Sequence, residues 1–201
     1  MNLNSRKTEY PIDSQFIERW SPRAFSNAEI PESTLMAGFE AARWAPSSSN
    51  SQPWRYIYSR RNSPTWNQFT SFLYDGNRVW ADKSAALIIL ISKKEFKAGD
   101  KVITSGTFAF DTGSAWMSFA LQMFKMGWYT HGMAGIHTDK IMADLKIPEG
   151  FIVNAMVAVG KPGNIENLPE ALQARETPSH RKPLEELVSH GKFDENWIKT
   201  E

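Results

Sequence analysis

Two short stretches of the sequence carry polar side chains that are suited to holding an anionic or flat polar ligand. Residues 19–23 read Arg-Trp-Ser-Pro-Arg and place two guanidinium groups and a hydroxyl within five positions. Guanidinium forks suit phosphate because they present several donors in a rigid plane, and a hydroxyl and free backbone N–H groups complete such a site. Within residues 45–54, a run of hydroxyl and amide residues lies between two prolines. These polar groups have no regular ladder to join, so a ligand or a partner chain would satisfy them.

Regular elements precede or follow both stretches. A short helical pattern over 13–20 leads into the first stretch. Apolar residues recur at helical spacing over 32–44, and Pro46 ends this helix because the residue before a proline is pushed out of the α region. Alternation from Trp54 to Ser59 predicts a strand after the second stretch. Both stretches are therefore loops at element ends, although a polar connector and two solvated surface arginines are simpler interpretations.

The remaining pattern alternates helices with buried strands. Runs at 85–91 and 151–159 lack polar alternation, which predicts strands that are buried on both faces. Further helices are predicted over 64–74, 112–126 and 138–146, with Ser63 and Thr138 as caps. The helix over 112–126 is apolar nearly all round and must be enclosed. One small protomer would struggle to enclose it while covering both faces of a sheet, so burial in a subunit interface is expected.

The last forty residues differ from the rest of the chain. Residues 160–183 contain four prolines and little apolar periodicity. A structureless stretch of this length inside a compact domain is uncommon, so it is either a disordered linker or an arm that lies on another surface. The weakly periodic apolar residues that follow, up to Ile198, favour the arm. We therefore expect one domain over 1–201 in which about 160–201 form a C-terminal arm.

Composition and charge exclude several classes of function. Lys plus Arg number 23 and Asp plus Glu number 22, with neither sign gathered along one element. This balance argues against nucleic acid and against an anionic membrane surface as partners. The apolar runs are too short to span a bilayer, and residues 1–10 lack an apolar signal core. A cytoplasmic location is expected.

Any redox chemistry must come from a cofactor, because the sequence contains no cysteine. The four histidines are not paired at i, i+4 beside a carboxylate, so no metal site is predicted. His131 and His180 are interpreted as structural hydrogen-bonding residues rather than proton donors. The sequence also has no Gly-x-Gly-x-x-Gly motif and no phosphate-loop lysine motif.

Taken together, the motifs resemble those of the FMN-dependent nitroreductase family. Members carry Arg-x-Ser-x-Arg/Lys near the N-terminus and, about one helix later, Ala-Pro-Ser-Ser-x-Asn-x-Gln-Pro-Trp. Both stand here almost unbroken, at 19–23 and 45–54. The resemblance continues through Asn77 and Trp80, through 132–135 (Gly-Met-Ala-Gly) and through 180–186, and so spans about residues 14 to 188.

The resemblance implies a fold, an assembly and a cofactor. The fold is an α+β three-layer sandwich with a central, mostly antiparallel sheet flanked by helices. The assembly is an intertwined homodimer with two FMN sites at the interface, and the C-terminal arm crosses onto the partner subunit. FMN carries the chemistry, so no side chain is predicted to be catalytic.

The resemblance also implies site residues. Arg19, Ser21 and Arg181 are expected at the FMN phosphate, and Arg23 at the pyrimidine edge, where a cation stabilises the reduced ring. Asn77 is expected to recognise the pyrimidine. A backbone N–H of Ala134 or Gly135 is expected to point at N5. Three residues of the second stretch, Ser47, Ser48 and Asn50, are expected to close the site from the opposite subunit.

This sequence departs from the family pattern at four of these positions. Trp20 stands where a basic residue or histidine is common, and it is kept among the expected cofactor contacts. Gly132 replaces a frequent proline, Ala134 an acidic residue, and Ser179 a second C-terminal cation. Phosphate binding is therefore expected to depend more strongly on Arg19 and Arg181.

The resemblance implies an NAD(P)H oxidoreductase that reduces nitroaromatics, quinones or similar planar electrophiles by a ping-pong mechanism. Two alternatives stay open. One is a dehalogenase or flavin-destructive branch of the same superfamily. The other is a carrier or sensor that binds flavin without useful turnover.

Overall fold

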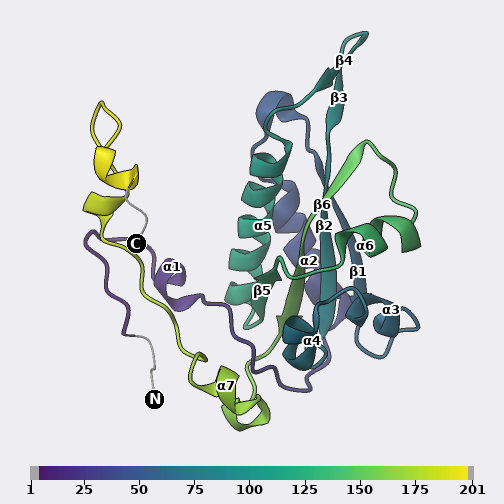
Figure 1. Cartoon of the computed structure of the whole chain (residues 1–201), viewed down its shortest axis with the longest axis vertical. Coiled ribbons are helices and arrows are strands. Elements are labelled where there is room, and N and C mark those ends of the chain that lie inside the picture. Colours follow the sequence, from purple (N-terminus) through teal and green to yellow (C-terminus); the bar gives the residue numbers. More distant parts are fainter. Residues whose placement is uncertain (1–4, 199–201) are drawn as a thin grey trace.

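A four-stranded sheet forms the centre of the computed structural model, which describes residues 5–198 (Figure 1). In spatial order its strands are β1 (Trp54–Arg60), β2 (Ala86–Lys93), β6 (Phe151–Gly160) and β5 (Tyr129–Met133). Each neighbouring pair is antiparallel. The predicted antiparallel sheet is confirmed. Of the two strands predicted to be buried on both faces, β2 is buried up to Ser92, whereas β6 is fully buried only from Met156 onward.

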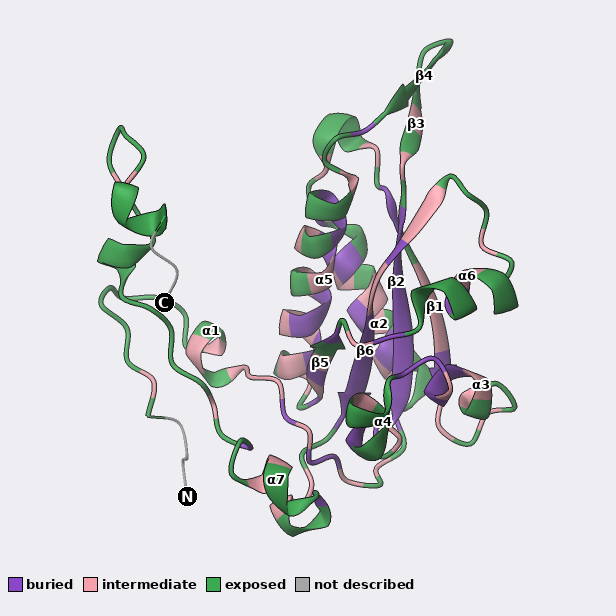
Figure 2. Cartoon of the chain, in the orientation of Figure 1, coloured by how far each residue is buried: buried purple, intermediate pink, exposed green. Residues whose placement is uncertain are grey.

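Strand β2 is buried on both faces, as its unbroken apolar sequence predicts (Figure 2). Ile88 packs with the residues of one helical layer and Ile89 with those of the other, because successive side chains of a strand point to opposite faces. Full burial of such a side chain contributes roughly 1.5–3 kcal/mol. The strand therefore needs helices on both sides.

One layer consists of α2 (Glu32–Arg43) and α5 (Phe108–Lys125), which pack against each other and against the sheet. Gly38 allows the close approach of the two helices. A Cβ atom at this position would lie 2.7 Å from Met123 Sδ and from Phe119 Cε2. A larger residue at Gly38 would therefore force the side chains of Met123 and Phe119 to move.

The other layer contains α3 (Trp66–Thr70), α4 (Asp75–Ala81) and α6 (Thr138–Asp144). Phe69, Trp80 and Ile141 are buried there against the odd-numbered residues of β2. With helices on both faces of the sheet, the three-layer α+β sandwich is confirmed.

Both predicted helix caps are wrong. Helix α3 begins at Trp66 after Thr65, and the Ser63 hydroxyl instead lies 2.8 Å from the Ser59 hydroxyl. Helix α6 has His137 at its N-cap, and Thr138 is its first helical residue. In both cases the hydroxyl residue lies one or two positions from the true cap, a distance that sequence patterns do not resolve.

Several elements lack a prediction from the sequence. Helix α4 and strand β5 are short, and β5 contains Gly132, which weakens its strand pattern. A hairpin of β3 (Glu95–Ala98) and β4 (Lys101–Thr104) projects from the body and is largely exposed (Figure 1). Its turn contains Gly99 at φ 60°, the left-handed region that glycine adopts without strain.

Helix α5 is only half enclosed within one chain. Ala115, Phe119 and Met123 are buried against the sheet. On the opposite side Phe110 is 79% exposed and Met117 is 37% exposed. These two residues are seven positions apart, so they share one face of the helix. A single chain therefore leaves an apolar face of α5 open.

The part of the C-terminal region nearest to β6 packs on its own chain. It contains η2 (Ile165–Asn167) and α7 (Glu170–Gln173), and Leu168 between them is buried in the core. Residues 177–198, called the arm below, then leave the body beside the N-terminal segment (Figure 1). The arm carries η3 (Leu184–Glu186) and η4 (Glu195–Ile198).

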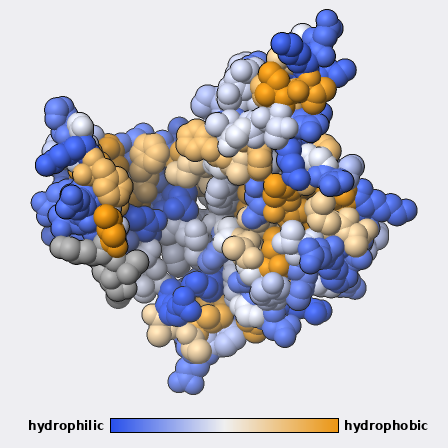
Figure 3. Space-filling model, turned by 45° about the horizontal axis from the view of Figure 1, so that its top comes forward, coloured by the Kyte–Doolittle hydropathy of each residue, from blue (hydrophilic) through white to orange (hydrophobic). Residues whose placement is uncertain are grey.

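The arm is exposed along most of its length. Figure 3 shows hydrophobic residues on its surface and a hollow between it and the body. The single domain predicted over 1–201 includes residues 1–4 and 199–201, which lie outside the described residues. Among the helices of the described part, none is both long and apolar enough to cross a membrane.

Candidate functional site

Arginines from three distant parts of the chain converge on one cavity. The cavity has a volume of about 350 Å³. The residues that line it are Arg6, Arg19, Trp20, Ser21, Arg23, His131, Arg175, Thr177, Ser179 and Arg181. None of these lining residues carries a carboxylate, so the described walls are strongly cationic.

Arg19 lies at the C-terminal end of α1 (Gln15–Glu18), where the chain turns to extended backbone. Its Nε is buried and has no hydrogen-bond partner among the described residues, while its Nη1 lies 3.5 Å from Ser21 Oγ. Burial, and then the charge of Arg181, lowers the pKa of Arg19. A buried guanidinium with an unsatisfied donor favours an anion in the cavity.

Arg6 joins the N-terminal segment to the arm. Its Nε donates to the Ser179 carbonyl over 2.8 Å, and its Nη1 donates to the Arg19 carbonyl over 2.8 Å. Burial, then Arg181 and then Arg19, lowers the pKa of Arg6. Arg6 lies outside every sequence motif, so no local pattern indicated it.

Arg181 enters the cavity from the arm. Its Nη1 donates to Ser179 Oγ over 3.1 Å and to the His180 carbonyl over 3.0 Å. The structure therefore brings together Arg19, Trp20, Ser21, Arg23 and Arg181 from the predicted site residues.

His131 forms part of the same cavity and was not predicted as a site residue. Its Nδ1 lies 3.0 Å from the Pro22 carbonyl, which can only accept, so Nδ1 carries the proton and Nε2 is free of one in the neutral ring. The ring centroid lies 4.6 Å from that of Trp80. Burial, with a smaller contribution from the charge of Arg23, lowers the pKa of His131 to about 4. His131 is therefore neutral at pH 7.

Asn77 and Gly135 form a second, neighbouring group. The Asn77 amide donates to the Gly135 carbonyl over 3.0 Å, and the backbone N–H of Tyr74 donates to the same carbonyl. A Cβ atom at Gly135 would lie 2.8 Å from Asn77 Nδ2. These contacts fix the turn through Ala134 against α4, outside the residues that line the arginine cavity.

The second polar loop lies far from the arginines within one chain. Ser47 precedes η1 (Ser48–Asn50), and the Ser48 N–H donates to Asp111 Oδ2 over 3.2 Å in the first turn of α5. The arginine cavity includes His131 of β5, the strand that follows the other end of α5. A helix of 18 residues is about 27 Å long, so the predicted residues Ser47, Ser48 and Asn50 do not join the cavity in one chain.

The second loop is nevertheless held in a constrained form. Ser49 and Asn50 both have φ 51°, and Gln52 has φ 48°. Such conformations cost free energy in residues other than glycine and persist where surrounding contacts impose them. The Ser47 hydroxyl accepts a hydrogen bond from the Gln52 N–H over 3.0 Å, which is one such contact. The loop therefore has a defined conformation that its own contacts hold.

The lowered pKa of His131 predicts a loss of stability in acid. The unfolded chain, with a histidine pKa near 6.5, binds the proton more readily than the folded chain, with a pKa of about 4. The contribution of the neutral His131 to the free energy of unfolding is therefore fully present above pH 6.5, and the free energy of unfolding falls by roughly 3 kcal/mol as the pH drops toward 4. Urea unfolding at several pH values should show a correspondingly smaller acid loss for His131→Gln. The exposed His190→Gln serves as control and should keep the wild-type profile, and equal profiles for all three proteins would contradict the assignment.

Comparisons with known proteins agree with this architecture. The model of the Nitroreductase family matches residues 17–64, which contain both polar stretches. None of the curated proteins matches the chain closely. A nitroreductase family protein from Streptococcus pneumoniae TIGR4 has 18% identity over 85% of this chain and 95% of its own, with a TM-score of 0.68.

Two further solved structures were described with FMN. A protein from Desulfovibrio desulfuricans, provisionally named a nitroreductase, was solved in complex with FMN; it has 20% identity over 93% of this chain and 100% of its own, with a TM-score of 0.71. An oxidoreductase containing FMN has 42% identity over 95% of this chain and 97% of its own, with a TM-score of 0.92. With a relative this similar over nearly its whole length and the match of the family model, the chain belongs to the nitroreductase family.

Proposed function

We propose that the arginine cavity binds the phosphate of FMN and that the protein is a flavin-dependent oxidoreductase. The observation that carries the proposal is the buried Arg19 Nε, which has no hydrogen-bond partner among the described residues and belongs to a cavity whose described lining contains no carboxylate. An FMN phosphate supplies nearly two negative charges to such a site. Relatives described as containing FMN support the same cofactor.

The residues fit the two ends of this cofactor. Arg19, Ser21 and Arg181 hold the phosphate, and Trp20 contributes to the wall beside them. Arg23 places a cation where negative charge develops when the ring is reduced. Asn77, Ala134 and Gly135 contact the ring from the neighbouring turn. When bound, FMN supplies the redox chemistry by accepting a hydride from a nicotinamide donor and passing two electrons to an acceptor.

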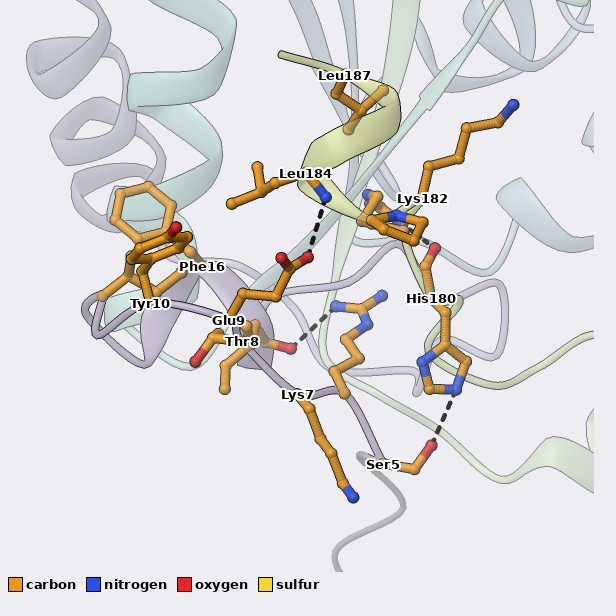
Figure 4. A pocket seen from close by; sticks show the side chains of 15 residues that line it. Ser5, Lys7, Thr8, Glu9, Tyr10, Phe16, His180, Lys182, Leu184 and Leu187 are labelled. Carbon is orange, nitrogen blue, oxygen red and sulfur yellow. Dashed lines mark hydrogen bonds between the residues drawn. The ribbon is translucent and has the colours of Figure 1, made fainter. Parts of the chain in front are cut away.

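We further propose a homodimer, because one chain leaves its site and several apolar surfaces incomplete. Ser47, Ser48 and Asn50 lie at the far end of α5 from the arginines, and a second chain brings them to the cavity. The open face of α5 and the apolar residues of the arm then find a partner. A cavity of about 680 Å³ between the N-terminal segment and the arm supports this proposal (Figure 4). Tyr10, Phe16, Leu184 and Leu187 line it and are all at least 40% exposed.

The proposed donor is NAD(P)H, and the proposed acceptors are nitroaromatics, quinones or similar planar electrophiles. A flavin carrier or sensor without useful turnover uses the same phosphate site, and a dehalogenase or flavin-destructive branch uses the same fold. These alternatives differ in turnover and in products rather than in the residues described here.

The phosphate assignment predicts a preference for FMN over riboflavin. Arg181→Ala should weaken FMN binding by about 1.5–3 kcal/mol, the usual contribution of a charge-assisted hydrogen bond. Isothermal titration of the flavin-free protein should also show much weaker binding of riboflavin, which lacks the phosphate. Lys192→Ala removes an exposed arm cation outside the cavity and should leave the affinity unchanged. Equal affinities for riboflavin and FMN would refute the phosphate site.

The dimer predicts a structural role for the arm. We expect an interface larger than about 2,000 Å², so that sedimentation detects no stable monomer. Deletion of residues 184–201 should destabilise the dimer and loosen FMN. Leu187→Asp should act in the same direction, and the polar neighbour Glu185→Ala should retain the dimer. A well-folded monomer that is replete with flavin after the deletion would rule out this role of the arm.

The oxidoreductase function predicts sustained oxidation of NAD(P)H with a nitroaromatic or quinone. Because one open face receives both substrates in turn, double-reciprocal plots should be parallel. FMN binding without sustained turnover would favour the carrier or sensor, and release of halide from a halogenated aromatic would favour the dehalogenase branch. Intersecting plots would exclude the ping-pong order.

A further inference from the structure

Glu176 is a buried carboxylate that no sequence motif indicated. It lies three residues after α7, at the root of the arm, and is 2% exposed. Its Oε1 accepts hydrogen bonds from the backbone N–H groups of Arg23 and Ala24, both over 2.7 Å. One carboxylate oxygen therefore joins positions that are more than 150 residues apart in the sequence.

The backbone on either side of Arg23 is held by other contacts. The Pro22 carbonyl receives the bond from His131. The Gly163 N–H donates to the Ala24 carbonyl over 2.7 Å. A Cβ atom at Gly163 would lie 2.5 Å from the Phe25 carbonyl carbon, so the two backbones pack as closely as glycine allows. Glu176 supplies the remaining hydrogen bonds of this segment, to the backbone N–H groups of Arg23 and Ala24.

The second oxygen of Glu176 has an electrostatic role. Oε2 is buried, has no hydrogen-bond partner among the described residues, and lies 3.9 Å from Arg23 Nη1. A buried carboxylate is costly unless a nearby charge compensates it. The Arg23 guanidinium, whose side chain is 20% exposed, is that charge, so the pair directs Arg23 along the wall of the cavity.

We propose that Glu176 is a positioning residue that fixes Arg23 in the cofactor site and offsets part of its positive charge there. This inference rests on the proposed function, because it takes Arg23 to lie beside the flavin ring. Glu176 then sets two properties of the site, the direction of the cation and the strength of its field. Glu176 directly precedes the arm that carries Arg181, so this stretch of the chain contributes to both ends of the proposed cofactor site.

The electrostatic role is tested with Glu176→Gln in the protein loaded with FMN. The glutamine carbonyl still accepts the two backbone bonds, but the negative charge is lost. The ratio of the dissociation constants of oxidised and reduced FMN should rise about tenfold, which is a potential increase of ~30 mV for a two-electron couple. Glu170→Gln removes an exposed carboxylate from α7 outside the cavity and should leave the ratio unchanged. Equal weakening of both oxidation states, with an unchanged ratio, would overturn the electrostatic role.

The positioning role is tested without any cofactor. In the flavin-free protein, Glu176→Ala should accelerate amide hydrogen exchange at Arg23 and Ala24 at least tenfold, whereas Glu176→Gln should stay close to wild type. Unchanged exchange in Glu176→Ala would overturn the positioning role. If wild type fails to bind FMN, the proposed function fails and the electrostatic role fails with it. The exchange experiment would still decide the positioning role.

Discussion

The repulsion between like-charged guanidinium groups is the constraint on which the rest of the structure depends. Arg6, Arg19 and Arg181 lie close enough for Arg181 to lower the pKa of both of the others. Such a cluster is unfavourable unless an anion joins it or strong bonds hold it together. Arg6 supplies part of the second condition through its bonds to two backbone carbonyls. Arg19 Nε is buried and has no hydrogen-bond partner among the described residues, which fits the proposed binding of an anion.

The sheet provides the rigid frame that keeps these charges in place. Its central strand is covered on both faces, so the loops at the strand ends are anchored to a well-packed core. Strand β5 supplies His131, and the residues just after β6 hold the backbone around Ala24 and Phe25. Arg23 thus lies on a short segment that is fixed from the sheet on one side and from Glu176 on the other. Side chains on such a segment are well suited to tuning a bound cofactor.

The incomplete surfaces of the chain have one common explanation. Within the described residues of one chain, the arm and the open face of α5 leave apolar side chains exposed, and the constrained loop at 47–52 lies far from the arginines. We propose that a second copy of the chain covers the apolar surfaces and brings the loop to the arginines. The same assembly would explain the extended arm, whose apolar residues are largely exposed in one chain.

The sequence by itself determined the core of the fold and one part of the site. The apolar runs of β2 and β6, which lack polar alternation, require cover on both faces, and the pattern over 32–44 predicts α2, because hydrophobic periodicity is a local property. Arg19, Ser21 and Arg23 were found because they lie within five residues of one another. Only the tertiary structure decided the contacts of Arg6, His131 and Glu176 with that motif. Each is a single polar residue without a neighbouring pattern, and its role comes from chain segments that folding brings together. The same reason explains why the short elements α4 and β5 were missed: their stability comes from packing on the sheet rather than from local sequence.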